Sequence, residues 1–157
     1  MRILKTAVTL GLSTLVVWGC GGPASTPEQQ VRETIRLGEE AAEGRNIGAL
    51  AGLVADAYQD GNGYDRRALV RLAQVYLMGH QSIHLLTRTQ SIELVSPDQA
   101  KAKVLVAMTG APLESVDSLI NVRADLFKFE IVLAKTDNEQ WQAVSASWQR
   151  AGADDFF

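Results

Sequence analysis

Hydrophobic and polar positions repeat with a helical period from residue 27 to residue 79. Apolar and small side chains recur every three or four positions, with charged side chains between them. The start at Thr26–Gln29 combines a capping hydroxyl, a proline at the first helical position and a glutamine that completes a capping box. We therefore expect three helices: one that ends before Gly44, a second from Ile47 to Ala57, and a third from Asp65 to Gly79.

The period changes to two from Ser82 onward, which is typical of β-strands. The first strand runs from Ser82 toward a turn at 96–99, and its pattern drifts near Ser91, where we expect a β-bulge. Three more strands follow at 100–108, 125–135 and 141–150, with a loop or short helix over 110–124. This order predicts an α+β domain: three N-terminal helices packed on a curved four-stranded antiparallel sheet. Such a sheet wraps the helices into a cone with a pocket at its open end.

The first 19 residues contain the three parts of a secretory signal. Arg2 and Lys5 make its start positive, residues 7–18 are mostly apolar, and Gly19 is a small residue before the cleavage point. The apolar segment is shorter than the roughly 20 residues of a permanent membrane-spanning helix. The chain's only cysteine, Cys20, follows directly. A lone cysteine in an exported protein has no internal disulfide partner, so we expect another use for it.

Residues 17–20, Val-Trp-Gly-Cys, resemble the bacterial lipobox, in which the cysteine is diacylated and becomes the mature N-terminus. Trp18 departs from this pattern, which prefers a small residue there. The resemblance implies a lipoprotein held in the cell envelope by the lipid on Cys20. Gly21 is not the aspartate of an inner-membrane retention signal, so we expect the periplasmic face of the outer membrane in a cell with two membranes. The alternative is ordinary signal cleavage that leaves a free thiol.

These observations divide the chain into a signal peptide at 1–19, a lipidated cysteine with a flexible linker at 20–26, a domain at 27–150 and a C-terminal tail at 151–157. The linker reaches at most ~20 Å when extended, so the domain stays close to the membrane. Hydrophobic residues make up 46% of the chain, and its net charge is −3. A mildly acidic protein without a basic stripe argues against both nucleic acid and anionic lipid surfaces as partners of the domain.

The order of elements and the final hairpin resemble the nuclear transport factor 2-like, or SnoaL-like, superfamily. Three helices precede a long hairpin, and a second hairpin passes through a turn at 137–139 into Trp141-Gln142-Ala143-Val144 and ends near Trp148. The resemblance covers residues 27–150. It implies a cone-shaped fold with a pocket between the sheet and the helices. The superfamily includes isomerases, dehydratases, transport adaptors and many non-catalytic domains, so the fold alone does not determine the function.

Catalysis in this superfamily requires a suitable set of polar groups in the cavity. In ketosteroid isomerase, an aspartate base works beside a tyrosine and a protonated aspartate in an apolar site. The catalytic candidates here are Asp56, Tyr58 and Asp125, with Tyr76 as a further tyrosine, and none lies on a motif that matches residue by residue. We expect Asp56 at a helix end and Asp125 at a strand start, where acidic residues are common for structural reasons alone.

His80 and His84 are four residues apart, a spacing that aligns two side chains on one helix. The pattern changes from helix to strand between them and no third ligand is near in the sequence, so we predict no metal site. Arg88 and Arg123 are candidates for polar contacts inside the pocket; the alternative is ordinary cross-strand charge pairing. The full set of pocket candidates is Tyr76, His84, Arg88, Arg123 and Trp148.

No phosphate-binding loop, nucleophile elbow, zinc signature or dinucleotide-binding turn occurs in the sequence, and we predict no cofactor. Our leading hypothesis is a non-catalytic envelope lipoprotein whose pocket binds an apolar or amphiphilic small molecule or another envelope protein. Two alternatives stay open. One is a SnoaL-like periplasmic enzyme with acid–base chemistry of the isomerase or dehydratase type, and the other is a homodimerising structural module.

Overall fold

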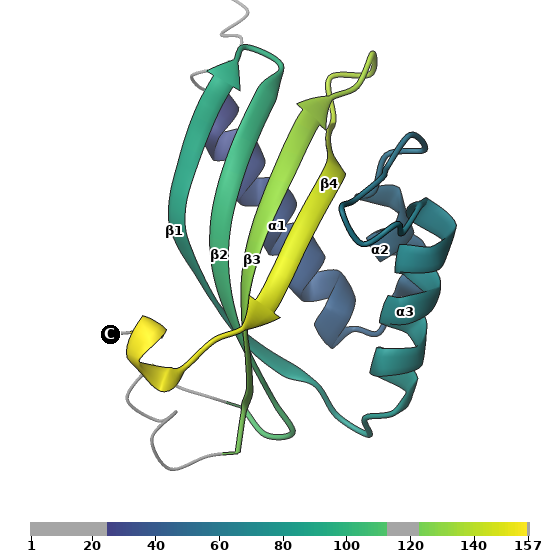
Figure 1. Cartoon of the computed structure of the whole chain (residues 1–157), viewed down its shortest axis with the longest axis vertical. Helices are drawn as coiled ribbons and strands as arrows, with labels where there is room; N and C mark the ends of the chain where they lie inside the picture. The colour runs from purple at the N-terminus through teal and green to yellow at the C-terminus, as the bar shows by residue number, and fades with distance from the viewer. Residues whose placement is uncertain (1–24, 113–122, 157) are drawn as a thin grey trace, which may run out of the picture.

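A computed structural model describes residues 25–112 and 123–156 as an α+β domain. Its elements in chain order are α1 (Pro27–Glu43), α2 (Ile47–Gly52), α3 (Arg66–Met78), β1 (His84–Ser96), β2 (Gln99–Thr109), β3 (Asp125–Lys135), β4 (Trp141–Arg150) and a short 3-10 helix, η2 (Ala153–Phe156). The strands form one antiparallel meander in the order β1-β2-β3-β4. Helix α1 crosses one face of the curved sheet, and α2 and α3 lie beyond its β4 side (Figure 1). The predicted fold class is confirmed.

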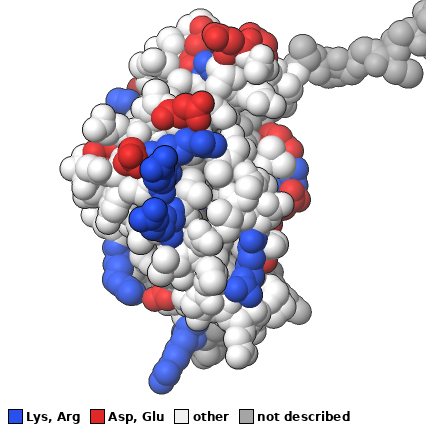
Figure 2. Space-filling model, turned by 90° about the vertical axis from the view of Figure 1, so that its right-hand side faces the viewer, with Lys and Arg blue, Asp and Glu red and all other residues white. Residues whose placement is uncertain are grey.

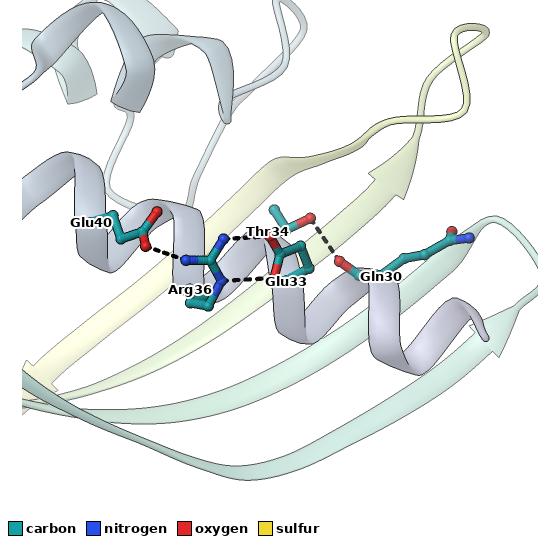
Figure 3. A network of polar contacts seen from close by, with 5 residues as sticks. All are labelled: Gln30, Glu33, Thr34, Arg36 and Glu40. Carbon is teal, nitrogen blue, oxygen red and sulfur yellow. Dashed lines mark hydrogen bonds and ion pairs between the residues drawn. The ribbon is translucent and has the colours of Figure 1, made fainter. Parts of the chain in front are cut away.

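Helix α1 begins as its sequence predicts. The Thr26 side chain accepts a hydrogen bond from the Gln29 backbone N–H, and the Gln29 side chain accepts one from the Thr26 backbone N–H. On the exposed side of the helix, Arg36 binds Glu33 one turn before it and Glu40 one turn after it (Figure 3). Exposed pairs of this kind contribute little to stability, because water screens their charges. The burial of the opposite side of α1, centred on Val31, therefore dominates its stability.

Helix α2 is shorter than the sequence predicts, which corrects the expected extent to Ala57. It ends at Gly52, and the chain then pairs with the exposed edge of β4. The Ala143 N–H donates to the Leu53 carbonyl at 2.8 Å, and the Ala55 N–H donates to the Ala143 carbonyl at 2.9 Å. The helical spacing of apolar residues continues past Gly52, but the unpaired edge of β4 offers these backbone groups better partners. This segment therefore covers the β4 edge.

The described sheet has three register shifts. Two lie on β1, one between Thr89 and Ser91, where the sequence predicts a bulge, and one between Leu94 and Ser96 beside the turn to β2. The third follows Val132 of β3, where β4 has one extra residue. Bulges increase the local bend of a strand. The sheet curves around α1 as a result (Figure 1).

The main core lies between the concave face of the sheet and α1. Its fully buried members share the inward parity of their strands and meet Val31 of the helix: Ala100, Ala102, Val104, Leu133 and Trp141. The inward face of β3 continues through Phe127, Phe129 and Ile131 toward α3, as the alternating pattern predicts. Among residues 25–112 and 123–156, no helix has both the length and the hydropathy of a membrane-spanning segment.

A second core lies on the opposite, outer face of the sheet. Phe156 of η2 is fully buried there against Leu105 and Ala107 of β2. The Arg88 guanidinium donates a hydrogen bond to the Phe156 carbonyl, and the Ala151 N–H donates to the Leu126 carbonyl at 2.9 Å. The C-terminal tail is therefore folded back on the domain as far as residue 156.

Candidate functional site

An apolar cavity of about 370 Å³ lies between the inward face of β3 and β4 and the helices α2 and α3. Its walls are almost entirely hydrocarbon and aromatic, and the side chains among them that carry a polar atom are Tyr58, Tyr76 and Trp148. A second hollow of about 290 Å³ adjoins it toward α1 and shares lining residues such as Met108 and Phe129 with it. Leu72 lines the cavity and stays 40% exposed. The cavity therefore reaches the surface beside α3.

A continuous row of rings forms one wall of the cavity. Trp148 lies 6.3 Å from Phe129, Phe129 lies 6.1 Å from Phe127, and Phe127 meets Tyr76 edge-on at 6.5 Å between ring centroids. Tyr64 stacks on the outer end of the row, 6.1 Å from Trp148. Rings at these separations attract one another beyond their area of contact. The row holds the wall of the cavity in a fixed shape.

Tyr58 reaches the cavity from the segment that pairs with β4. Its residue is 2% exposed, and its hydroxyl donates to Asp60 Oδ2 at 3.0 Å. The other oxygen of Asp60 accepts from the backbone N–H groups of Asn62 and Tyr64. Burial, and then the hydrogen bond to Asp60, raise the pKa of Tyr58 far above its ordinary value. This tyrosine therefore stays neutral, and its partner carboxylate closes the neighbouring turn.

A small polar cleft of about 220 Å³ adjoins the cavity at Tyr76. The Tyr76 hydroxyl donates to Asp125 Oδ2 at 3.0 Å, and Arg150 Nη1 donates to Asp125 Oδ1 at 3.1 Å. Burial, followed by the hydrogen bond to this carboxylate, raises the pKa of Tyr76 to about 12. Arg123 and His80 also line this cleft. The cleft thus adds charged and hydrogen-bonding groups to one edge of an apolar cavity.

His80 belongs to this cleft through its contact with Tyr76. The two rings stack at 4.6 Å, and His80 Nδ1 lies 2.8 Å from the Tyr76 carbonyl oxygen. A carbonyl oxygen only accepts, so Nδ1 carries a proton and Nε2 is the nitrogen left for another partner. Within residues 25–112 and 123–156, no three His, Cys, Asp or Glu side chains gather as a metal site would require.

The structure brings together some of the sequence-predicted site residues and separates others. Tyr58, Tyr76 and Trp148 line the cavity, and Asp125 and Arg123 line the adjoining cleft. The tyrosine and carboxylate candidates do not form one cluster, because Tyr58 binds Asp60 while Asp125 binds Tyr76. Cys20 lies outside the described residues.

Asp56, His84 and Arg88 do not line the cavity. The Asp56 side chain is 97% exposed and forms a surface ion pair with Arg66 at 3.3 Å. His84 and Arg88 share the strand parity of Leu86, which packs on the outer-face core, so they point away from the helices. The alternating pattern of β1 assigns these residues to one face, but which face meets the helices is decided by packing.

Sequence reasoning did not identify Asp60 and Arg150 as functional candidates. Asp60 follows Tyr58 by two residues in a turn, a position where aspartate is common for local reasons. Arg150 reaches Asp125 because β3 and β4 pair with Phe127 opposite Arg150. Only this strand register brings Arg150 close to Asp125. To predict the register from the sequence, one must know where the bulge after Val132 lies.

Larger hollows on the surface have different walls. One of about 740 Å³ lies between the start of α1 and the β3–β4 turn, and its lining includes Gln29, Gln30 and Glu33. Another of about 540 Å³ lies between α2 and α3 beside Arg67 and Arg71. Both hollows mix charged and amide side chains with apolar ones. The apolar cavity is therefore the better candidate for a small-molecule site.

No family model matches this chain, and no curated protein matches its sequence. Solved structures do match its fold. A candidate scytalone dehydratase from Novosphingobium aromaticivorans superposes with a TM-score of 0.65 at 12% identity, covering 80% of this chain and 84% of that one. A candidate dehydratase from the NTF2-like family of Streptomyces avermitilis gives 0.58 at 16% identity, covering 81% and 99%.

The chain has the nuclear transport factor 2-like fold. This confirms the resemblance that its order of elements suggests. A further match, the protein Bd1075 from Bdellovibrio bacteriovorus, has a TM-score of 0.61 at 13% identity; the match covers 79% of this chain and only 40% of that longer chain. At these identities the similarity establishes the fold alone. The function must be argued from the cavity of this nuclear transport factor 2-like domain.

Proposed function

We propose that this protein is a membrane-anchored lipoprotein of the bacterial envelope whose domain holds an apolar or amphiphilic small molecule without changing it. The observation that carries the proposal is the cavity of about 370 Å³ behind β3 and β4. Ligand sites in proteins are mostly apolar hollows of roughly 300–1,000 Å³ with a few polar groups at fixed places. This cavity has that size and that composition.

The chemistry of the walls supports the class of ligand. A hydrocarbon chain or ring system that leaves water for this cavity gains about 25 cal/mol for each Å² of apolar surface that it buries. A strongly polar molecule would lose its hydration against walls whose polar side-chain groups are only those of Tyr58, Tyr76 and Trp148. The polar cleft beside Tyr76 suits the head of an amphiphile whose apolar part lies in the cavity.

The anchor is proposed from the sequence. Residues 1–19 have the form of a signal peptide, and Cys20 follows them in a lipobox-like segment. Lipid on Cys20 and the short linker at 21–26 would hold the domain near the outer membrane, where amphiphiles are concentrated. A Cys20→Ala variant should lose the lipid mass and leave the membrane fraction; a variant that keeps both would refute the anchor.

Native mass spectrometry of the protein, extracted gently from its own envelope, tests the cavity. We expect an added mass that belongs to an apolar or amphiphilic molecule, beyond any lipid on Cys20. Ala73→Phe should abolish it, because Ala73 lines the cavity from α3 and the larger ring would fill the space. Gln74→Phe is the matched control, since Gln74 is the next residue of the same helix and lies exposed outside the cavity. Loss of the ligand in both variants, or no ligand in the parent, would count against the proposal.

A second function, acid–base catalysis, is favoured by one observation. The Tyr76 hydroxyl and the Asp125 carboxylate meet at 3.0 Å where the cavity joins the cleft. An enzyme would be isolated with a mixture of substrate and product in its cavity. Its Asp125→Asn variant, which lacks the acid–base group, would hold substrate alone. A carrier would hold the same molecule in both forms of the protein. The second oxygen of Asp125 accepts a hydrogen bond from Arg150, which gives this carboxylate a structural role. We therefore favour ligand binding over catalysis.

A protein partner or a second copy of the chain stays an alternative occupant of the surface. The outer face of the sheet is the place for a homodimer, and η2 already covers part of it. Light scattering over a range of concentrations decides this point. A monomer at high concentration would exclude the dimerising module.

A further inference from the structure

The exposed side of α3 has an unusual composition for a protein surface. Arg67, Arg71, Val75 and Met78, which we call the α3 face, lie at intervals of four, four and three residues and therefore share one side of the helix. Val75 is 66% exposed and Met78 is 68% exposed. Arg67 and Arg71 are also exposed, and no ion pair joins either to a carboxylate in the part of the chain that the structure describes. One side of this helix thus combines free apolar groups with basic ones.

The α3 face differs from a typical solvated helix surface. On α1, the exposed arginines are paired with glutamates of the same helix: Arg32 with Glu28, and Arg36 with Glu33 and Glu40. Helix α3 has no Asp or Glu at any position of its own. Seen from the side of α2 and α3, basic groups gather near the middle of the molecule beside a wide uncharged area (Figure 2). Arginines and exposed apolar side chains on one side of a helix are typical of segments that lie on anionic membrane surfaces.

Helix α2 separates the start of the described chain from the α3 face (Figure 1). Ser25 borders the same surface hollow as Ala49 and Gly52 of α2. Ala51 of α2 in turn borders the hollow that contains Arg67 and Arg71. The lipid on Cys20, which belongs to the function proposed above, would bring the domain within reach of a bilayer, and the α3 face is the part of its surface that suits one.

We propose that the α3 face docks on the surface of an anionic lipid bilayer, with Val75 and Met78 in the interface and Arg67 and Arg71 on lipid phosphates. The cavity suggests a function for this contact with the bilayer. Leu72 lies next to Val75 on the helix, lines the cavity and stays 40% exposed. Docking through the α3 face places the opening of the cavity at the membrane. An amphiphile then passes between bilayer and cavity without crossing bulk water.

The methionine on the α3 face provides the test. Thioether oxidation by dilute peroxide needs water and oxidant at the sulfur, so a bilayer that covers Met78 slows it. The processed protein, purified as the cell makes it, is oxidised with vesicles that contain phosphatidylglycerol, with phosphatidylcholine vesicles, and without vesicles. Peptide mass spectrometry follows Met78, with Met108 of the cavity as internal reference.

We expect the anionic vesicles to slow oxidation of Met78 several-fold and the neutral ones to have little effect. Arg67→Gln with Arg71→Gln should abolish most of this protection of Met78, since each basic residue near such a surface contributes about a factor of five to the contact. Arg32→Gln with Arg36→Gln is the matched control, with two exposed arginines four residues apart on α1, and it should keep the protection. Equal oxidation of Met78 with and without anionic vesicles would overturn the proposal. The intact mass reports the lipid on Cys20 separately, so a failure of the anchor and a failure of this docking are distinguishable.

Discussion

Replacing Phe156 with alanine removes a ring that is fully buried on the outer face of the sheet. The ring packs against Leu105 and Ala107 of β2, and the backbone beside it is held by Arg88. Deleting a buried phenylalanine side chain costs about 3–5 kcal/mol in protein cores. Since η2 is the last described element and the chain there can relax, we expect a loss of about 3 kcal/mol, the lower end of that range.

Thermal unfolding followed by circular dichroism measures the effect. For a domain of this size, each kcal/mol lowers the melting temperature by about 3 to 4 °C, so Phe156→Ala should melt about 10 °C lower than the parent. Asp154→Ala is the matched control, because Asp154 is an exposed residue of the same short helix and should change the melting temperature by less than about 2 °C. A Phe156→Ala protein that melts within 2 °C or so of the parent would show that η2 is not part of the folded core.

Three further predictions concern other contacts. Arg66→Met removes donors to the carbonyls of Ala51 and Val54, so it should lower the free energy of unfolding by about 2 kcal/mol in urea titrations; a change below about 0.5 kcal/mol would contradict this. Gly63→Ala should cost about 1 kcal/mol in the same assay because Gly63 has a φ of 82°, and an unchanged urea midpoint would argue against the strain. The pKa of Tyr76 is raised to about 12 by burial and then by its contact with Asp125, so its contribution to stability is complete below about pH 10 and is lost as the pH rises toward 12. Tyr76→Phe should therefore have a free energy of unfolding that falls less steeply over this range, and identical slopes would refute the assignment.

The local signals of the sequence determined most of the secondary structure. The capping box at Thr26, the cap at Asp65 and the alternation in β3 depend on a few adjacent residues, and the structure has each of them where the sequence predicts it. These features are governed by hydrogen bonds and side-chain directions within one or two turns or within a single strand. The order of three helices and four strands then leaves the helices as the cover of one sheet face, which predicts the fold class.

Tertiary structure alone decided which residues meet in the site. Alternation along β1 groups His84 with Arg88, but only the packing of α1 determines that this group points to the outer face. The contact of Tyr76 with Asp125 joins residues 49 positions apart, and it depends on where α3 crosses the end of β3. The same holds for Phe156, whose burial needs a face of the sheet that the helices leave open. Such contacts depend on strand register and on competition for apolar surface between distant segments, and no local pattern of residues encodes them.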